Sequence, residues 1–409
     1  MPHVPLVTAA IIFLATYAII GIQGIPRIHI DRPSGALLGA TAMVAFGVLT
    51  LQQAYQAIDL DTILFLLGMM ILVAYLELSG FFEVVERWII GRARSTRALL
   101  ALVVISSGVL SALFMNDTVC LLYAPVIVRV TKRLGLNPVP YLIALATSAN
   151  IGSVSTIIGN PQNALIGIQS HIRFLEFSRR LWPVAAAGIL VDFAILAFKY
   201  RKEITGAPLV VPPPRKPGTV QRWMLLVSIS AGAAMFILLC LNFHAPSVAM
   251  GLASIVILAG SRKPLRALQQ VDWTLLFLFA GLFVVMRGVE EAGLTALIFR
   301  RTSFLLGESS LAAAAGLSAV IAALSNLVSN VPAVMLYIPL LKAQAAGEKL
   351  WLLLAMASTL AGNLTLIGSV ANLIVLEATK DEVNISFLEY LKTGLPVTLL
   401  TILAGTLIL

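Results

Sequence analysis

Apolar segments alternate with short polar or charged stretches along the whole chain. Several of these segments are roughly 17–25 residues long, which is enough for a helix to cross the hydrocarbon core of a bilayer, about 30 Å thick. The pattern predicts uninterrupted membrane-spanning helices near residues 4–25, 34–51, 62–78, 183–200, 222–242, 247–261, 273–290 and 394–409. An amphipathic segment near residues 81–90 is expected to follow the third of these spans.

Four further apolar segments are interrupted by polar residues, proline or glycine. Residues 99–129 are broken at Asn116-Asp117-Thr118 and residues 311–342 at Ser329-Asn330-Val331-Pro332, which predicts two re-entrant hairpins. Residues 141–168 and 351–376 are broken between Thr156 and Asn163 and between Thr365 and Asn372, which predicts two broken helices. Such breaks expose backbone groups that are costly in lipid unless a solute or protein satisfies them, so they point to a transport site. Ordinary proline kinks and small-residue helix packing are the alternative.

The breaks occupy matching places in two halves of the chain. Asp59, Gly68 and Glu77 recur 213 positions later as Asp272, Gly281 and Glu290. The segment Phe174-Leu175-Glu176-Phe177 recurs at the same offset as Phe387-Leu388-Glu389-Tyr390. A proline-rich linker over residues 204–220 separates the two copies. We therefore predict two repeats, residues 1–203 and residues 221–409.

The repeats are expected to be inverted relative to each other. With a hairpin that enters and leaves on one side, each repeat has five transmembrane helices, and an odd number reverses the orientation of the second copy. Most of the 28 Lys and Arg residues fall in loops that then share the face of the linker. The positive-inside rule places this face in the cytoplasm and both termini outside, in the cell inner (plasma) membrane.

Composition agrees with an all-α polytopic membrane protein. The chain of 409 residues is 59% hydrophobic and 11% charged, with a mean hydropathy of +0.97. The net charge of +9 resides in short loops and forms no basic patch interleaved with aromatics, so it does not indicate nucleic-acid binding. The first apolar run has no basic residue before it and no cleavage site after it, which favours a permanent helix over a signal peptide.

Motifs for catalysis or for a bound cofactor were not found in the sequence. Cys120 and Cys240 lie inside apolar segments, which is typical of small buried hydrophobic residues. The four histidines share no metal-ligand spacing, and a phosphate-binding glycine loop with lysine is absent. We therefore expect no enzymatic activity, no cofactor and no metal site.

Two acidic residues within the membrane segments are candidates for proton coupling. Asp117 lies at the first hairpin break, and Asp192 lies inside the span that follows Pro183. An ionised carboxylate at membrane depth costs at least a few kcal/mol, so such a group tends to exchange a proton or to pair. The alternatives are that Asp117 caps the second arm of the hairpin and that Asp192 faces a polar neighbour. The repeat counterpart of Asp117 is Val331.

The four interrupted motifs together resemble the ion transporter superfamily. The run from Ser148 to Asn163 is preceded by Asn116-Asp117, and it is followed by the runs from Ser325 to Pro332 and from Ala361 to Asn372. The arsenite efflux permease branch is the most similar. Relatives in the dicarboxylate branch carry Ser-Asn-Thr at both hairpin tips, and this chain departs from that pattern.

The resemblance implies an inverted-repeat fold in which hairpin tips and unwound loops enclose substrate and coupling ion. Arsenite near neutral pH is a small neutral hydroxy acid, for which amide and hydroxyl groups are suitable hydrogen-bond partners. The residues predicted to bind substrate are Asn116, Thr118, Asn150, Thr156, Asn160, Asn163, Ser329, Asn330, Thr365, Ser369 and Asn372.

The function expected from these observations is secondary active transport. The first hypothesis is proton-coupled efflux of arsenite, antimonite or a related small oxyacid by alternating access. The second is sodium-coupled symport of a dicarboxylate or another anion. A third, from another class, is a passive channel or the membrane subunit of a pump with a soluble ATPase partner. A homodimer is compatible with each.

Overall fold

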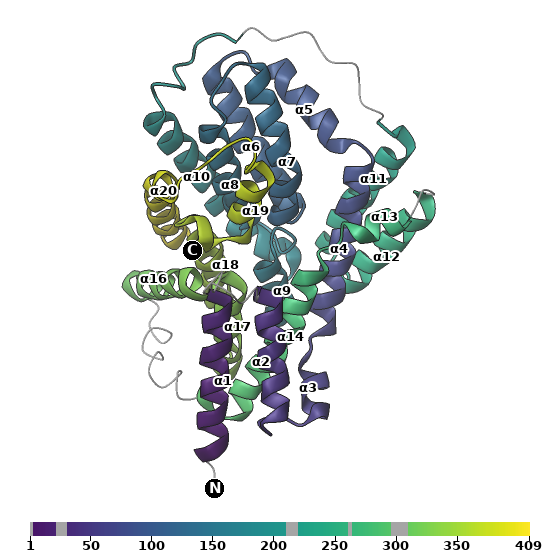
Figure 1. Cartoon of the computed structure of the whole chain (residues 1–409), viewed down its shortest axis with the longest axis vertical. Coiled ribbons are helices and arrows are strands. Elements are labelled where there is room, and N and C mark those ends of the chain that lie inside the picture. The colour runs from purple at the N-terminus through teal and green to yellow at the C-terminus, as the bar shows by residue number, and fades with distance from the viewer. Residues whose placement is uncertain (1–2, 22–30, 210–219, 261–263, 296–309) are drawn as a thin grey trace.

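The computed structural model describes residues 3–21, 31–209, 220–260, 264–295 and 310–409 (Figure 1). This part of the chain is helical and contains no strand. Residues 210–219 of the predicted linker lie outside it. The helices before the linker are α1 (His3–Gly21), α2 (Arg32–Ala45), α3 (Leu51–Ala57), α4 (Leu60–Leu78), α5 (Phe81–Arg92), α6 (Thr96–Leu113), α7 (Asn116–Arg133), α8 (Val139–Ser153), α9 (Pro161–Ser170) and α10 (Phe174–Lys199).

The described helices after the linker follow a similar order. They are α11 (Arg222–Cys240), α12 (Ala245–Ala259), α13 (Pro264–Gln269), α14 (Trp273–Glu291), α16 (Leu311–Val328), α17 (Asn330–Ala343), α18 (Glu348–Ala361), the short 3-10 helix η1 (Leu366–Gly368), α19 (Val370–Thr379) and α20 (Phe387–Ile408). Among the described residues, seven helices are long and apolar enough to cross a membrane, namely α4, α6, α10, α11, α14, α16 and α20. The chain is therefore an all-α polytopic membrane protein.

Two helix boundaries differ clearly from the hydrophobic pattern. The apolar segment 34–51 does not form one helix, because α2 ends at Ala45 and Gly47 turns the chain with a φ of 71° before α3 begins. The last helix of each half begins earlier than expected, so Pro183 and Pro396 lie inside α10 and α20. Proline is tolerated there because neighbouring helices compensate for the missing backbone hydrogen bond.

The two halves pack on each other through reciprocal glycine contacts. Helix α2 packs against α14, and α4 packs against α12. A Cβ atom added to Gly281 would lie 2.7 Å from the carbonyl carbon of Ala36, and one added to Gly68 would lie 2.6 Å from that of Ala249. Gly68 and Gly281 are repeat counterparts, and so are Ala36 and Ala249. The same close backbone approach therefore occurs twice, with the roles of the halves exchanged.

These contacts give a direct prediction for Gly281→Ala. The added methyl group must push α14 away from α2, and overpacking of this kind costs about 1–3 kcal/mol. We expect a lower melting temperature of the purified protein in detergent. Gly251→Ala is the matched control, because a Cβ atom there meets no atom within 4 Å and alanine is the better helix former. Equal stability of the two variants would show that the helices are not held this closely.

The hairpins and broken helices of the two halves pack against one another. Helices α6 and α7 are joined through Phe114 and Met115, and α16 and α17 are joined through Ser329, whose φ is 78°. Helix α7 packs against α19 of the other half, and α17 packs against α9. In Figure 1, α9 and α18 lie between the group α5–α8 and the group α1–α3. The second arm of each hairpin thus meets the broken helix of the other half.

Candidate functional site

Four helices begin at the four predicted breaks. Asn116 and Asn330 are the first residues of α7 and α17, whereas Asn160 and Ser369 are the N-caps of α9 and α19. The first hairpin therefore turns at Phe114 and Met115, which directly precede the predicted break at Asn116-Asp117-Thr118. The first backbone N–H groups of a helix lack intrahelical partners and carry a partial positive charge, which favours oxygen-rich or anionic groups nearby.

The broken helices are held open by the same side-chain contacts in each half. The Nδ2 group of Asn163 donates to the carbonyl oxygen of Thr156 at 3.1 Å, and its counterpart Asn372 donates to that of Thr365 at 3.0 Å. Thr156 donates to the carbonyl oxygen of Ala112 at 2.6 Å. Two of the residues predicted to bind substrate, Asn163 and Asn372, therefore satisfy freed backbone groups of the unwound segments, and Thr156 joins the first of these segments to α6.

Asn150 is the centre of a buried amide network that joins the halves. It accepts from Nδ2 of Asn116 at 2.8 Å and from the hydroxyl group of Ser369 at 3.1 Å. Its own Nδ2 donates to Asn363 at 2.9 Å and to Asn372 at 3.1 Å. All five side chains are buried. The unwound segments of both broken helices and the tip of the first hairpin are thereby fixed to one another.

Sequence reasoning missed Asn363, although a signal for it existed. Asn363 lies inside the polar run from Ala361 to Asn372, and its side chain hydrogen-bonds directly to that of Asn150. Thr359 was also missed. Its hydroxyl group accepts from Asn160 and Gln162, both at 3.3 Å, and donates to Asn163 at 3.3 Å.

A small cavity of about 30 Å³, which we call the central cavity, lies between the two hairpin tips. Five residues predicted as site residues line it together: Asn116, Asp117, Ser329, Asn330 and Ser369. Its other polar lining residues are Gln162 and Arg32. Arg32, in the first turn of α2, was not among the predicted site residues, because it directly precedes the apolar segment 34–51, a position typical of a loop at the membrane surface.

Asp117 is half-buried and lies in the first turn of α7. It is not the capping residue considered as the alternative, since the N-cap is Met115. A carboxylate in this turn interacts favourably with the helix dipole. Asp117 lines both the central cavity and a larger one, so this carboxyl group stands at the boundary between them.

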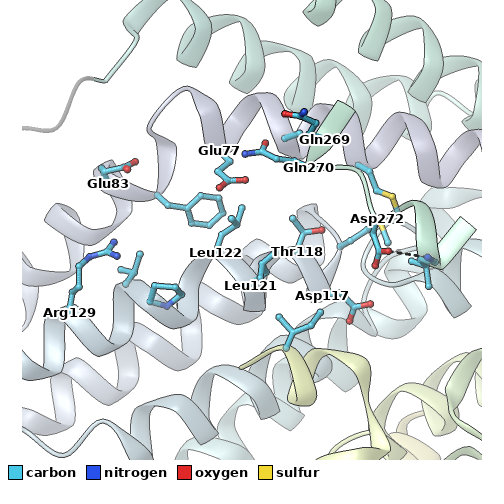
Figure 2. Close-up of a pocket in the computed structure, with 18 residues that line it drawn as sticks. Glu77, Glu83, Asp117, Thr118, Leu121, Leu122, Arg129, Gln269, Gln270 and Asp272 are labelled. Atoms are coloured by element: carbon cyan, nitrogen blue, oxygen red, sulfur yellow. Dashed lines mark hydrogen bonds between the residues drawn. The ribbon is translucent and has the colours of Figure 1, made fainter. Parts of the chain in front are cut away.

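The larger cavity, which we call cavity A, has a volume of about 580 Å³ and is lined by Glu77, Asp117, Thr118, Arg129 and Asp272, among others (Figure 2). A third cavity, cavity B, of about 350 Å³, is lined by residues that include Asp59, Gln169, Glu290 and Lys342. Both also have apolar walls.

Cavities A and B are lined by residues that correspond to each other under the predicted repeat. Glu77 and Asp272 of cavity A correspond to Glu290 and Asp59 of cavity B. Further matched pairs include Gln269 with Gln56, Pro125 with Pro339, Leu121 with Met335, and Ile374 with Leu165. Each cavity therefore occupies the same place relative to its own hairpin.

The polar contacts around the two cavities are unequal. In cavity B, Gln169 donates to the carboxylate of Asp59 and accepts from the ammonium group of Lys342. This bridge connects α9, α17 and the start of α4. The counterparts of Gln169 and Lys342 are Ala378 and Val128, which cannot form it.

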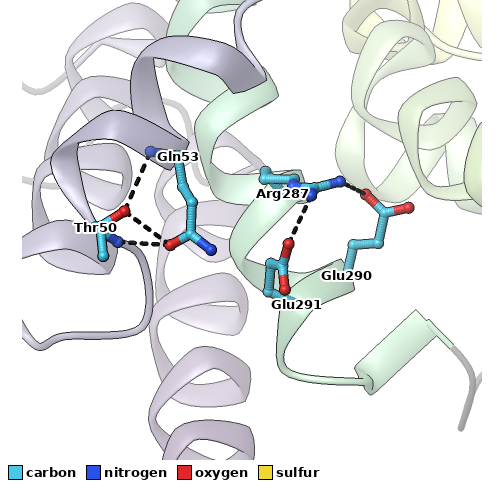
Figure 3. Close-up of polar contacts among 5 residues, drawn as sticks. All are labelled: Thr50, Gln53, Arg287, Glu290 and Glu291. Atoms are coloured by element: carbon cyan, nitrogen blue, oxygen red, sulfur yellow. Dashed lines mark hydrogen bonds and ion pairs between the residues drawn. The ribbon is translucent and has the colours of Figure 1, made fainter.

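Further ionic contacts belong to cavity B. Arg287 pairs with Glu290 at 3.2 Å and with Glu291 at 2.6 Å on α14, across from the capping box of Thr50 and Gln53 that begins α3 (Figure 3). Cavity B thus has several ordered polar contacts around it.

Asp192 lies apart from these cavities. Its side chain is completely buried in α10, and Oδ2 accepts from the hydroxyl group of Thr147 at 3.1 Å, whereas Oδ1 has no hydrogen-bond partner. Asn363 donates to the carbonyl oxygen of Thr147 at 3.2 Å, so Asp192 is connected to the amide network through one residue. It does not line any of the three cavities, and its coupling role stays a prediction.

Comparison with known proteins places the chain among transporters. Residues 11–361 match the family model described as citrate transporter, CitMHS. The silicon efflux transporter LSI3 of Oryza sativa subsp. japonica is 31% identical, with 93% of each chain covered. A protein of Dictyostelium discoideum whose name includes arsB is 25% identical, over 93% of this chain and 87% of that protein. The crystal structure of the Alcanivorax borkumensis YdaH transporter has a similar fold, with a TM-score of 0.58 at 14% identity, covering 98% of this chain and 96% of that one.

Proposed function

The chain belongs to the citrate transporter family, and we propose that it is a secondary active transporter that exports a small oxyacid, such as arsenite or antimonite, in exchange for protons. The observation that carries this proposal is the lining of the central cavity. The two hairpin tips contribute to it, and so do the starts of α9 and α19, which are the second parts of the broken helices. The carboxyl group of Asp117 lies in the same lining. Amide, hydroxyl and backbone N–H groups there offer both donors and acceptors to a hydroxylated solute.

The size of the central cavity favours a small solute. A volume of about 30 Å³ has room for about two water molecules. It is thus closer in size to a hydroxy acid of arsenic or silicon than to a tricarboxylate such as citrate. The relative named as a silicon efflux transporter supports the same class, because silicic acid, like arsenite, is a neutral polyhydroxylated molecule near neutral pH.

We propose that the solute passes between cavities A and B by alternating access. Counterpart residues line the two cavities, which supports two inverted repeats that open toward opposite faces. Cavity A shares Asp117 and Leu275 with the central cavity, whereas cavity B shares no lining residue with it. With the linker in the cytoplasm, cavity A faces the cytoplasm. The structure then corresponds to a state in which the central cavity is accessible from the cytoplasmic side.

The bridge in cavity B is proposed to hold the outer side closed. Gln169→Leu removes its hydrogen bonds to Asp59 and Lys342, and hydrogen bonds to charged groups contribute about 1.5–3 kcal/mol each. We expect a cysteine at Met335, a buried lining residue of cavity B, to react with maleimide at least about tenfold faster in this variant. Gln270→Leu in cavity A is the control. An unchanged rate would remove the bridge from the gating scheme.

Transport by the chain itself is tested in two steps. Expression in an arsenite-sensitive bacterial strain should restore growth in arsenite, and everted vesicles from these cells should accumulate arsenite when respiration acidifies their interior. Accumulation should stop on addition of a protonophore and should not need sodium. Uptake that is driven by sodium and inhibited by dicarboxylates would contradict the proposal. Uptake that continues with ATP alone, after the proton gradient has been collapsed, would contradict it as well.

A further inference from the structure

Helix α5 lies where two membrane-spanning helices end on the linker side. It connects α4 to α6, which are both long and apolar enough to cross a membrane, and it runs obliquely between α4 and α7 (Figure 1). Its 12 residues extend about 18 Å as a helix, which is too short to cross a hydrocarbon core of about 30 Å. Just after α5, the carbonyl oxygen of Arg94 accepts from the backbone N–H of Leu209 in the linker at 3.0 Å. Helix α5 is therefore placed at the membrane surface on the linker side.

The inner face of α5 packs against the first hairpin. Phe82 and Ile89 are buried, and α5 contacts both α6 and α7. Glu86 accepts from Nε and from Nη2 of Arg129 in α7, at 3.2 and 2.9 Å. These contacts fix α5 to the helix whose first turn contains Asp117.

The opposite face of α5 combines an exposed aromatic ring with positive charge. Trp88 and Val84 are 43% and 37% exposed, and the guanidinium carbon of Arg92 lies 4.8 Å from the centroid of the indole ring. Arg87 is also exposed. Gly91 follows Arg87 by four residues and Trp88 by three, so it shares their face, and a Cβ atom added to it would meet no atom within 4 Å. We call these five residues the outer face of α5.

The charges of α5 are divided between its two faces. Glu83 lines cavity A, and Glu86 pairs with α7. In the part of the chain that the structure describes, no carboxylate lies within 4 Å of the guanidinium nitrogens of Arg87 or Arg92. Nε of Arg87 donates to the carbonyl oxygen of Glu83 at 3.3 Å, a neutral partner that does not cancel the charge. The outer face therefore presents two uncompensated positive charges beside apolar surface.

We propose that the outer face of α5 binds the headgroup of an anionic phospholipid, whose phosphate is held by Arg87 and Arg92 and whose acyl chains lie against Val84 and Trp88. Guanidinium groups donate paired hydrogen bonds to phosphate, and helices with Trp and Arg on one exposed face are typical of the headgroup region. Gly91 leaves room for the headgroup to approach the helix. The site is separate from the central cavity and goes beyond the proposed function, because its occupancy does not depend on the transported solute.

Quenching of Trp88 fluorescence by brominated lipid tests this proposal. The variant used keeps Trp88 and replaces the other four tryptophans by phenylalanine, namely Trp182, Trp223, Trp273 and Trp351. Its vesicles contain phosphatidylglycerol as a minor component in phosphatidylcholine, with bromine on the acyl chains of one lipid or the other. We expect the local fraction of phosphatidylglycerol at Trp88 to exceed the bulk fraction at least about threefold, because each nearby arginine gives roughly a fivefold preference for an anionic surface.

Gly91→Glu and Gly91→Gln are the matched variants, because the open space at Gly91 accepts a side chain without a clash. Gly91→Glu places a negative charge beside the proposed phosphate, so the local fraction of phosphatidylglycerol should fall to the bulk value. Gly91→Gln should keep most of the enrichment. The double variant Arg87→Gln/Arg92→Gln should lose it.

A second measurement uses the complete chain with all its tryptophans, so the test does not depend on the single-tryptophan variant. In detergent, added phosphatidylglycerol should raise the melting temperature of Gly91→Gln but not that of Gly91→Glu. Equal local and bulk fractions of phosphatidylglycerol at Trp88 would overturn the proposal. Shielding of Trp88 from both brominated lipids would show that protein covers this face, and displacement of phosphatidylglycerol by inorganic phosphate at constant ionic strength would show a site for soluble anions. Either result would also contradict lipid binding here.

Discussion

Asp117→Asn is expected to abolish the accumulation of arsenite in everted vesicles while leaving the protein folded. One pH unit corresponds to a tenfold ratio of solute for each proton exchanged, so a gradient of about two units sustains up to about a 100-fold ratio in the wild type. Without a group that exchanges its proton at the boundary of cavity A and the central cavity, the ratio should fall to about one.

The matched control for this variant is Asp61→Asn. Asp61 is exposed and lies 3.5 Å from the imidazole of His244, away from all three cavities. Vesicles with the Asp61→Asn variant should therefore accumulate arsenite as wild-type vesicles do. Asp192→Asn separates the second predicted coupling residue from the first, since Asp192 is buried and lies outside the cavities. Full, protonophore-sensitive accumulation by Asp117→Asn would remove Asp117 from the mechanism.

Asn150→Ala is expected to have the largest effect on stability. The substitution removes hydrogen bonds to Asn116, Asn363, Asn372 and Ser369, all of which are buried. A buried polar group left without a partner costs about 1–3 kcal/mol, so the total loss should exceed about 3 kcal/mol. We expect a melting temperature lower by at least about 5 °C, with little transport at the growth temperature.

Asn137→Ala provides the comparison for this measurement. Its side chain donates to Glu203 at 2.8 Å and accepts from the backbone N–H of Val139 at 3.1 Å, and because Asn137 is exposed, water can replace these contacts. Its melting temperature should therefore stay close to that of the wild type. If Asn150→Ala were as stable as Asn137→Ala, the amide network would not hold the broken helices together.

The sequence was sufficient to predict the elements that enclose the site. Apolar length located the spans apart from the segment 34–51, and the polar breaks located the starts of α7, α9, α17 and α19 to within a few residues. The offset of 213 positions also relates Gly68 to Gly281, whose contacts connect the halves. These features depend on local chemistry and on repetition, both of which a single sequence displays.

Other features depend on tertiary packing and were not predictable in this way. Asn163 and Thr156 are polar residues at a break, as Asn116 is, but their side chains hydrogen-bond to backbone carbonyl groups, of the unwound segment for Asn163 and of α6 for Thr156. Arg32 follows an acidic residue at the start of a span, a position typical of an interfacial loop, and reaches the site only because α2 packs along α14. The predicted span 183–200 begins at Pro183, whereas α10 begins at Phe174 and continues through this proline.

The most direct test of the account is the sidedness of cavities A and B. Gln269 and Gln56 are counterparts, are exposed, and line cavities A and B respectively. A cysteine is placed at one or the other in a chain whose Cys120 and Cys240 are replaced by serine, and an impermeant maleimide is applied to right-side-out and everted vesicles. Two inverted repeats predict that the cysteine at Gln269 reacts only in everted vesicles and the cysteine at Gln56 only in right-side-out vesicles. Reaction of both from the same face would contradict transport between two oppositely oriented halves.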